Sequence, residues 1–487
     1  MLGAFDVAGK SQIIMPDTNR QDERLLYWTD ELIKEARARK AKEAATKALD
    51  SKEIEALARS VYEEVRTKAA NDGVSLDPDL ILRLIGELSG LGPLLELIAR
   101  DDVEDIASNL GHIYIYTTGA GWKYVGKAPG GMGDGLRVMM DRAGYHPPTP
   151  DSPIADAMLQ VTVPTLSGEI KRKGVRINFV MPPASPYGDT ITLRVSKYNT
   201  SSTGQAGGLA VLCENRLPPV SRPTFQPKAF PQGNGVMTPE IANYILSVMV
   251  TGGTLIFSGA TGSGKTFVAQ RVIQEMLNFY PRGSIRLFIV EDSNEIVLNG
   301  WDGSLESDTG NIIYTVTRPE IDGGPAAVTM YQLIRAALRS RPHGLIIGEA
   351  RGAEAWELVR AASTGHGHSA FTIHATSAEQ VWSRFLQVVQ AHDEAMRLSE
   401  LKIAQNFAQA VTAVIHIERH PVYGQIVQEV AEVSHIVESA ASRPAFNSLF
   451  QFNSNKNTQV PTGNRPMRPG FTSRELGIPE SMFRTGG

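Results

Sequence analysis

Residues 252–267 read GGTLIFSGATGSGKTF, and this stretch decides the fold of the second half of the chain. The apolar residues 254–257 predict a buried strand, and a helical pattern begins near Thr266. Between them, residues 259–266 fit the pattern G-x-x-x-x-G-K-[ST] without a gap. A strand, a glycine-rich loop and a helix in this order predict a site for the phosphates of a nucleoside triphosphate. The alternative is an ordinary glycine-rich turn.

Each residue type in this loop has a chemical role. Glycines let the backbone fold tightly, so that its N–H groups point at one phosphate chain. Lys265 supplies a positive charge that reaches the β- and γ-phosphates, and the hydroxyl of Thr266 is a ligand for Mg²⁺. The following helix directs the positive end of its dipole at the phosphates. We expect the nucleotide to contact Gly259, Ala260, Thr261, Gly262, Ser263, Gly264, Lys265, Thr266 and Phe267.

Length and composition place the chain among ordinary globular proteins. Its 487 residues suggest about three domains, and 42% apolar with 21% charged residues is typical of a soluble protein. A net charge of −4 gives no support to direct binding of nucleic acid. Cys213 is the only cysteine, which excludes an intramolecular disulfide and favours a reducing compartment. We see no signal peptide or membrane span and expect a cytoplasmic protein.

Composition shifts divide the chain into five parts. Residues 1–75 have helical periodicity with alternating acids and bases, and we expect a solvated helical arm. Residues 76–200 mix helix and strand patterns and predict an α+β domain. Residues 201–236 are rich in Pro and Gly, as in a linker. Residues 237–435 alternate helix and strand patterns, which predicts an α/β domain with a parallel sheet. Residues 436–487 predict an irregular tail.

Acidic residues follow a second apolar run at 285–290. Glu291, Asp292 and Glu295 stand where a buried strand is expected to end. Ligands bind outside the carboxyl ends of strands in open α/β sheets, and a carboxylate there can take a proton from the attacking water. A capped turn with solvated acids is an equal alternative.

A third apolar run, GLII at 344–347, leads to Glu349. A carboxylate at the end of a strand next to the phosphate-loop strand is the usual partner of Mg²⁺. Arginines surround it in the sequence, although the alternative for any one of them is a surface ion pair. They are Arg335, Arg339, Arg341 and Arg351.

Three histidines lie close together in the sequence: His366, His368 and His374. A zinc site built from three imidazoles is one alternative, but the segment offers no evident carboxylate to support the ligands. A neutral imidazole that contacts the γ-phosphate or a neighbouring subunit fits better beside a phosphate loop.

Four stretches in this order resemble the motifs of the secretion superfamily of traffic ATPases, which power type II and type IV secretion, conjugation and type IV pili. GATGSGKT, EDSNE, LRSRPHGLIIGEARG and STGHGHSAFTIHATS are similar to that family's Walker A motif, Asp box, Walker B motif and His box. Upstream, GLGPLLELIARDDVEDIASN, RINFVMPPAS and ITLRVSKY resemble the branch that serves Tad pili, type IV secretion and conjugation. The resemblance covers about residues 80–433.

The resemblance implies a hexameric ring of RecA-like P-loop motor domains. The nucleotide, ATP with Mg²⁺, would lie between the motor domain and an N-terminal sensor domain. By motif, Lys265 and Thr266 would bind phosphate and Mg²⁺, and Glu349 would support Mg²⁺. The implied catalytic set adds the general base Glu295, the His-box residue His374, and Arg176 and Arg194 of the N-terminal domain, which would neutralise transition-state charge. His366 also matches a His-box position.

Some details separate the branches of the family. The proline-rich stretch 217–235, the additional His368 and the variant EDSNEI depart from the family pattern. A single cysteine excludes the four-cysteine zinc insertion of the type II branch, and GEARG differs from the GEMRD of retraction motors. These features favour the Tad-pilus, type IV secretion and conjugation branch.

The function predicted from the resemblance is ATP hydrolysis that drives pilus assembly or secretion. The partners would be other copies of the chain and platform or channel proteins, and the chain would be peripheral at the cytoplasmic face of the bacterial inner membrane. Three alternatives remain: a retraction motor, a hexameric nucleic-acid translocase, and a nucleotide-binding subunit with little turnover. The charge of −4 argues against the second, and the intact set of Lys265, Thr266, Glu295 and Glu349 against the third.

Overall fold

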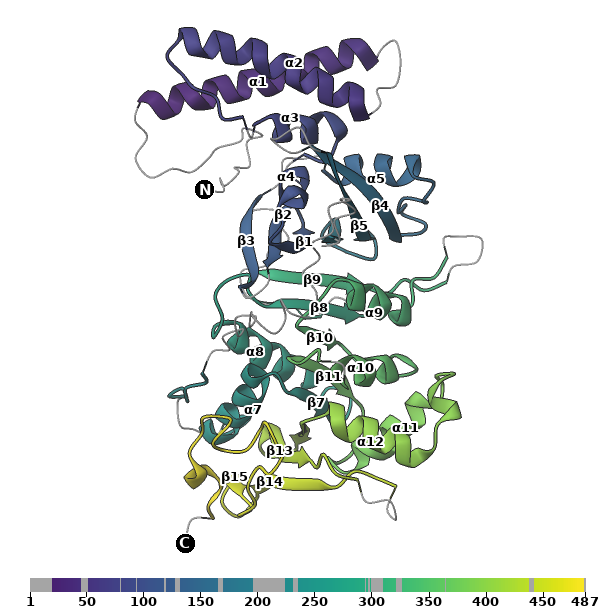
Figure 1. Cartoon of the computed structure of the whole chain (residues 1–487). Coiled ribbons are helices and arrows are strands. Elements are labelled where there is room, and N and C mark those ends of the chain that lie inside the picture. Colours follow the sequence, from purple (N-terminus) through teal and green to yellow (C-terminus); the bar gives the residue numbers. More distant parts are fainter. Residues whose placement is uncertain are drawn as a thin grey trace, which may run out of the picture. The chain divides into compact units, whose positions relative to one another are not determined.

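The chain forms two compact units. One comprises residues 1–220 with 303–308, and the other comprises residues 221–302 with 309–487. The computed structural model (Figure 1) describes residues 20–44, 51–78, 80–92, 94–117, 120–127, 132–164, 170–195, 224–230, 235–293, 295–296, 298, 310–320, 326–363, 365–437 and 442–485. The linker predicted at 201–236, with Cys213, lies mostly outside these residues.

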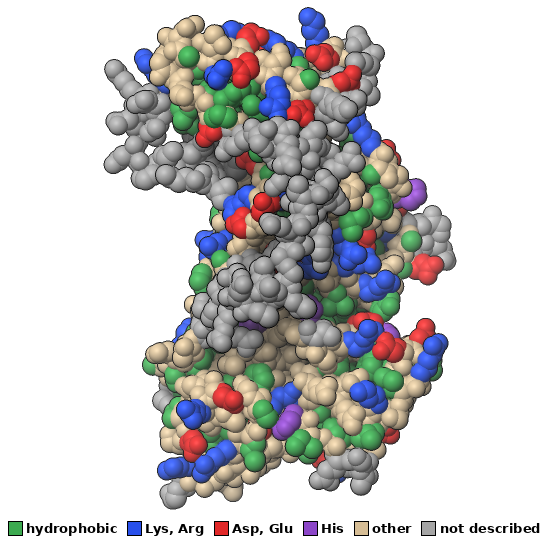
Figure 2. Space-filling model, in the orientation of Figure 1, with side chains coloured by type: hydrophobic (Ala, Val, Ile, Leu, Met, Phe, Trp, Pro, Cys, Tyr) green, Lys and Arg blue, Asp and Glu red, His purple; other side chains and the backbone are tan. Residues whose placement is uncertain are grey.

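The first unit begins with helices. The two segments predicted as a helical arm are α1 (Arg20–Ala44) and α2 (Ser51–Asn71), which lie side by side (Figure 1). Figure 2 shows basic and acidic side chains interspersed over them, and Arg39 bridges to Glu35 and Glu64. Three further described helices of this unit are α3 (Leu80–Ser89), α4 (Leu94–Ala99) and α5 (Met132–Arg142).

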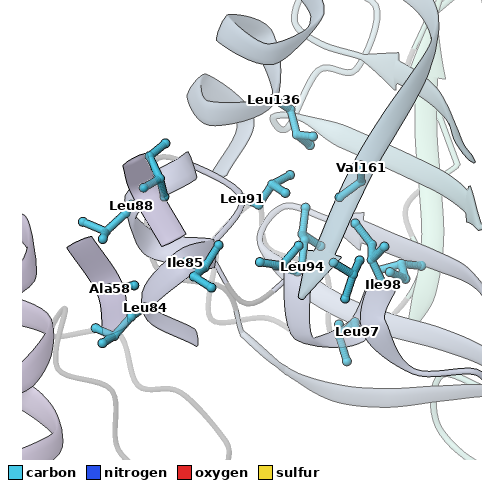
Figure 3. Close-up of a cluster of buried hydrophobic side chains, with 14 of the residues drawn as sticks. Ala58, Leu84, Ile85, Leu88, Leu91, Leu94, Leu97, Ile98, Leu136 and Val161 are labelled. Atoms are coloured by element: carbon cyan, nitrogen blue, oxygen red, sulfur yellow. The ribbon is translucent and has the colours of Figure 1, made fainter. Parts of the chain in front are cut away.

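One apolar core joins these five helices to a sheet. Ala58 of α2, Leu84 of α3 and Leu94 of α4 are fully buried in one cluster, together with Leu136 and Val161 (Figure 3). Because α1 and α2 contribute Leu32, Ala36 and Val61 to the same cluster, they belong to the core of this unit.

The sheet of the first unit has six antiparallel strands in the order β3-β2-β1-β6-β5-β4. The strands are β1 (Val103–Asn109), β2 (His112–Thr117), β3 (Gly121–Lys127), β4 (Ile154–Pro164), β5 (Ile170–Val180) and β6 (Thr190–Val195). The α+β pattern predicted after residue 76 is therefore present.

The second unit is built on a nine-stranded sheet in the order β15-β14-β13-β12-β7-β11-β10-β8-β9. The six strands from β12 to β9 are parallel, and they are β7 (Thr254–Ser258), β8 (Arg286–Glu291), β9 (Asn311–Val316), β10 (Gly344–Ile347), β11 (Ser369–Ile373) and β12 (Ala413–His420). All residues of β7, β8, β10 and β11 are buried, as expected of strands covered on both faces. The alternation predicted from residue 237 is confirmed here.

Helices cover both faces of this sheet. In Figure 1, α7 (Pro239–Thr251) and α8 (Lys265–Leu277) lie on one side. On the other side lie α9 (Met330–Arg339), α10 (Glu354–Ser363), α11 (Gln380–Val389) and α12 (Glu400–Ala410), with a short 3₁₀ helix at Ala395–Arg397. No helix among the described residues combines the length and the apolar character that crossing a bilayer needs.

The predicted irregular tail at 436–487 is wrong for much of its length. β14 (Phe446–Asn453) pairs with β13 (Gly424–Val433), and β15 (Thr458–Pro461) pairs with β14. Phe450 packs against Tyr244 and Phe483 of the 3₁₀ helix Glu480–Phe483, and all three are buried. Two of the scattered phenylalanines, Phe450 and Phe483, are therefore core residues, which helps to explain why a tail so rich in polar residues is ordered.

Candidate phosphate-binding site

The phosphate loop connects the end of β7 to the first turn of α8. Gly259, Gly262 and Gly264 have φ angles of 152°, 73° and 87°, which side-chain-bearing residues rarely adopt. Gly264 is the N-cap of α8. A Cβ atom on Gly259 would lie 2.6 Å from Oγ of Ser263, and one on Gly264 would overlap the amide of Gln425. Both positions therefore require glycine for conformation and for space.

Lys265 is held inside this loop. Its side chain is nearly buried, and its Nζ donates to the carbonyl oxygens of Gly259 at 3.1 Å and Ala260 at 2.9 Å. Burial lowers the pKa of Lys265, and the nearby carboxylate of Glu349 partly opposes this. An ammonium group has three N–H donors, so these two bonds leave one for a further acceptor.

The other loop residues differ in exposure. Oγ of Ser263 is buried and has no hydrogen-bond partner among the described residues, which is a costly arrangement unless a ligand completes it. Thr266 is half-buried, while Phe267 is exposed with the guanidinium of Arg271 5.2 Å from its ring centroid.

Glu349 lies at the same edge of the sheet as the loop. Glu349 follows β10. Because the strands are parallel, the carboxyl ends of β10 and β7 lie at the same edge of the sheet. β11 lies between β10 and β7, however, so the prediction that Glu349 follows the strand next to the phosphate-loop strand is wrong by one strand. The carboxylate contacts Arg351 at 2.8 Å and Nε2 of His374 at 2.9 Å. The bond from Arg351, helped by the charges of His374 and Lys265, lowers its pKa.

The acids after β8 take different roles. Glu291 is buried and accepts backbone N–H groups from Glu295 at 3.3 Å and Ile296 at 3.1 Å, so it caps the turn. Burial raises the pKa of Glu291 to about 7 despite these bonds. Asp292 accepts from Thr317 and pairs with Arg351 at 3.5 Å. Glu295 is exposed. The capped turn is thus present, but Glu291, the acid that caps it, is buried, whereas Asp292 and Glu295 are exposed.

The three histidines do not converge. His374 follows β11 and contacts Glu349, whereas His366 and His368 precede β11 at the opposite edge of the sheet. A five-residue strand spans roughly 17 Å, so no metal ion can bridge the two ends. The described residues contain no group of three or more His, Cys, Asp or Glu side chains arranged to hold a metal.

His366 and His368 have structural contacts at their edge. Nδ1 of His366 lies 3.1 Å from the carbonyl oxygen of Ala361, and Nδ1 of His368 lies 2.6 Å from that of Met249. Burial lowers the pKa of His366. The prediction that a histidine contacts the γ-phosphate therefore does not apply to these two, and of the three histidines only His374 lies at the same edge of the sheet as the loop.

Arg176 and Arg194 lie in the first unit. They face each other across β5 and β6, and both are exposed. Nε of Arg194 donates to the buried carboxylate of Asp105 at 3.0 Å. Of the arginines that are near Glu349 in the sequence, Arg351 binds its carboxylate, whereas Arg335 and Arg339 lie on α9 and Arg341 follows that helix.

Sequence reasoning missed a second set of residues beside the loop. Ser258 Oγ lies 3.1 Å from Nδ1 of His416, whose Nε2 lies 3.3 Å from Glu418, and burial lowers the pKa of this histidine. Gln425 donates to the carbonyl oxygen of Gly264 at 3.2 Å. His416, Glu418 and Gln425 belong to the hairpin β12–β13, about 160 positions after the loop. The pairing of β12 with β7, whose last residue is Ser258, brings them near.

Comparisons with known proteins show which families this chain is similar to. Residues 233–444 match the family described as "Type II/IV secretion system protein". A putative conjugal transfer protein of Mycobacterium tuberculosis is 29% identical over 236 residues, which cover 46% of this chain and 62% of that protein. The probable conjugal transfer protein TrbB of Sinorhizobium fredii is 30% identical over 200 residues, which cover 41% of this chain and 54% of that protein. The matches thus span less than two thirds of these relatives.

A solved structure shares the fold. The VirB11 ATPase of the Brucella suis type IV secretion system, crystallised with sulphate, matches 70% of this chain and 93% of its own with a TM-score of 0.50 and 21% identity. At this identity the match supports the fold, while residue roles have to be argued from the geometry of this chain.

Proposed function

Since the chain is related to the type II/IV secretion proteins through residues 233–444, we propose that it is a motor ATPase of the type IV secretion and conjugation branch. ATP hydrolysis in the second unit, a RecA-like motor domain, would drive assembly of or transport through such a system. One observation carries this proposal: a glycine loop with a buried lysine shares one sheet edge with a carboxylate that is held by an arginine and a histidine.

The geometry of the loop fits a triphosphate. Gly264 in the left-handed conformation begins α8, so the first backbone N–H groups of the helix are available to an anion. The buried Oγ of Ser263 and the third N–H of Lys265 add polar groups that a phosphate oxygen can satisfy. Burying a lysine ammonium costs free energy, and an ordinary turn without a ligand would not offset this cost.

The donor set also fits Mg²⁺, which prefers oxygen ligands. The hydroxyl of Thr266 and the carboxylate of Glu349 would hold the ion, directly or through water. When bound, the ion would neutralise negative charge on the phosphate oxygens. Arg351 and His374 hold the Glu349 carboxylate ionised and oriented, because each contacts a different oxygen of it.

Three further residues, one acid and two arginines, would take the remaining catalytic roles. Glu295, exposed after β8, would accept the proton of the attacking water. Arg176 and Arg194 would neutralise charge that develops on the γ-phosphate when the first unit closes on the nucleotide. A triphosphate favours the closed state more than a diphosphate, so hydrolysis would relax the closure, and that movement is the stroke.

The assembly is part of the same proposal. The chain would form a homo-hexameric ring at the cytoplasmic face of the bacterial inner membrane and pass its motion to platform or channel proteins there. Both charge signs alternate on α1 and α2, so these helices give no support to nucleic acid as the direct partner.

The test is Mg²⁺-dependent ATP turnover by the purified chain and by Lys265→Ala. Lys456→Ala is the matched control, because Lys456 is exposed in the turn between β14 and β15. We expect Lys265→Ala to lose turnover at least about a hundredfold with an unchanged unfolding midpoint, since it removes the charge at the phosphates. Near-normal turnover in a folded Lys265→Ala protein would refute the nucleotide assignment.

A further inference from the structure

The hairpin β12–β13 packs directly against the phosphate loop. β12 pairs with β7 so that His416 stands opposite Ser258, and the ladder between β12 and β13 shifts register between His416 and Ile417. Beyond this irregularity, the carbonyl oxygen of Ile417 lies where a Cβ atom on Gly259 would have to be. The first glycine of the loop is thus enclosed by the backbone of β12.

The last glycine of the loop is enclosed by a side chain of β13. Gln425, opposite Arg419 in the hairpin, directs its amide at Gly264 and donates from Nε2 to the Gly264 carbonyl oxygen at 3.2 Å. The same oxygen accepts the N–H of Val268 at 3.0 Å, the first hydrogen bond of α8. A Cβ atom on Gly264 would overlap the Gln425 amide. Gln425 therefore occupies the space that the missing side chain leaves.

These two bonds fix one peptide plane. In a trans peptide the C=O of one residue and the N–H of the next point in opposite directions. Two donors on the Gly264 oxygen hold this carbonyl toward the hairpin and the helix, so the N–H of Lys265 is directed the opposite way. That N–H belongs to the first turn of α8 and is among those with no partner inside the helix.

We propose that Gln425 is a positioning residue of the nucleotide site. Its amide holds the peptide between Gly264 and Lys265 so that the Lys265 N–H donates to the phosphate chain. The inference rests on the proposed function and adds to it a residue outside the four motifs. Because the contact orients the loop and touches no reacting atom, its loss weakens the binding of ATP and ADP alike and leaves the chemical step largely unchanged.

The experiment compares Gln425→Ala and Gln425→Glu with Gln451→Ala and Gln451→Glu. Gln451 is a matched control because it is an exposed glutamine on the adjacent strand β14, with its amide 3.5 Å from Glu429. Dissociation constants for ATP and ADP with Mg²⁺, KM, kcat and the unfolding midpoint are measured for each purified full chain. Gln425→Glu keeps the size of the side chain, so it remains informative if the alanine variant folds poorly.

We expect Gln425→Ala to raise both dissociation constants and KM roughly three- to tenfold, the range that one neutral hydrogen bond gives, with kcat within about twofold. Gln425→Glu should lose more affinity for ATP and ADP than Gln425→Ala does, because its carboxylate faces a carbonyl oxygen and the phosphates. The Gln451 variants should match the wild type.

Two results would overturn the inference. In one, the Gln425 variants bind nucleotide as well as the Gln451 variants do. In the other, the alanine and glutamate variants lose binding equally and in step with a lower unfolding midpoint, which is what a purely structural contact predicts. Lys265→Ala, measured in parallel, separates a failure of the Gln425 inference from a failure of the proposed function. If Lys265→Ala also binds ATP normally, the nucleotide assignment itself has failed.

Discussion

Replacing Glu291 with glutamine should change how the stability of the second unit depends on pH. Glu291 is only 3% exposed, and its burial raises its pKa from the ordinary 4.5 to about 7. Between these two pH values the folded state binds more protons than the unfolded state, so the free energy of unfolding falls as the pH rises. The loss of stability that comes from ionising the buried Glu291 is complete above about pH 7. The difference between the two pKa values corresponds to about 3 kcal/mol, and it already includes the effect of the backbone N–H groups of Glu295 and Ile296, which favour the ionised form.

Urea unfolding at about pH 5 and about pH 8 measures this effect. Glutamine does not ionise, and its Oε1 can accept both backbone N–H groups that Glu291 Oε1 accepts. Glu291→Gln should therefore have near wild-type stability at pH 5 and exceed it by up to about 3 kcal/mol at pH 8. Glu320→Gln, which changes an exposed acid of the same unit, is the control. If the wild type and Glu291→Gln respond to pH in the same way, burial does not perturb Glu291 and the reasoning is wrong.

Three further predictions concern the other acids, the first unit and the tail. Glu295→Gln should bind ATP normally and turn over at least about a hundredfold more slowly, as expected for loss of a general base; if Glu349→Gln alone behaves so, the two acids have exchanged roles. Arg176→Ala should lower kcat at least about tenfold without changing ADP affinity, because it acts on γ-phosphate charge, and an unchanged kcat would exclude it from the chemistry. Phe450→Ala should destabilise the second unit by about 3–5 kcal/mol, as measured by urea unfolding, and more than Phe452→Ala, since Phe450 is buried and Phe452 only half-buried; equal effects would contradict the core role of the tail.

The part of the site that is local in sequence could be predicted from the sequence. The phosphate loop is contiguous, and each glycine has the conformation that its pattern requires. Glu349 and His374 could be placed because each follows an apolar run that forms a parallel strand, and such strands end at one edge. Sequence order alone could not tell that β11 separates β10 from β7, since that depends on how the crossovers return.

The features that the sequence does not predict have a common physical cause, which is that residues close in the chain can lie apart in the fold and residues far apart in the chain can be in contact. Histidines only a few positions apart were grouped, although a strand between them carries His366 and His374 to opposite edges of the sheet. Gln425 and His416 were overlooked because their proximity to the loop comes from strand pairing over a long sequence separation. The sequence predicts an irregular tail because apolar residues are few there, yet Phe450 and Phe483 complete a core supplied mostly by other elements.

The most direct test of the central claim is a structure of the full chain with a non-hydrolysable ATP analogue and Mg²⁺. The account predicts the β-phosphate within hydrogen-bond distance of the backbone N–H groups of the loop and of Lys265 Nζ, with the ion between the phosphates, Thr266 and Glu349. A saturated complex in which the phosphates bind elsewhere, and Lys265 still donates only to Gly259 and Ala260, would contradict it.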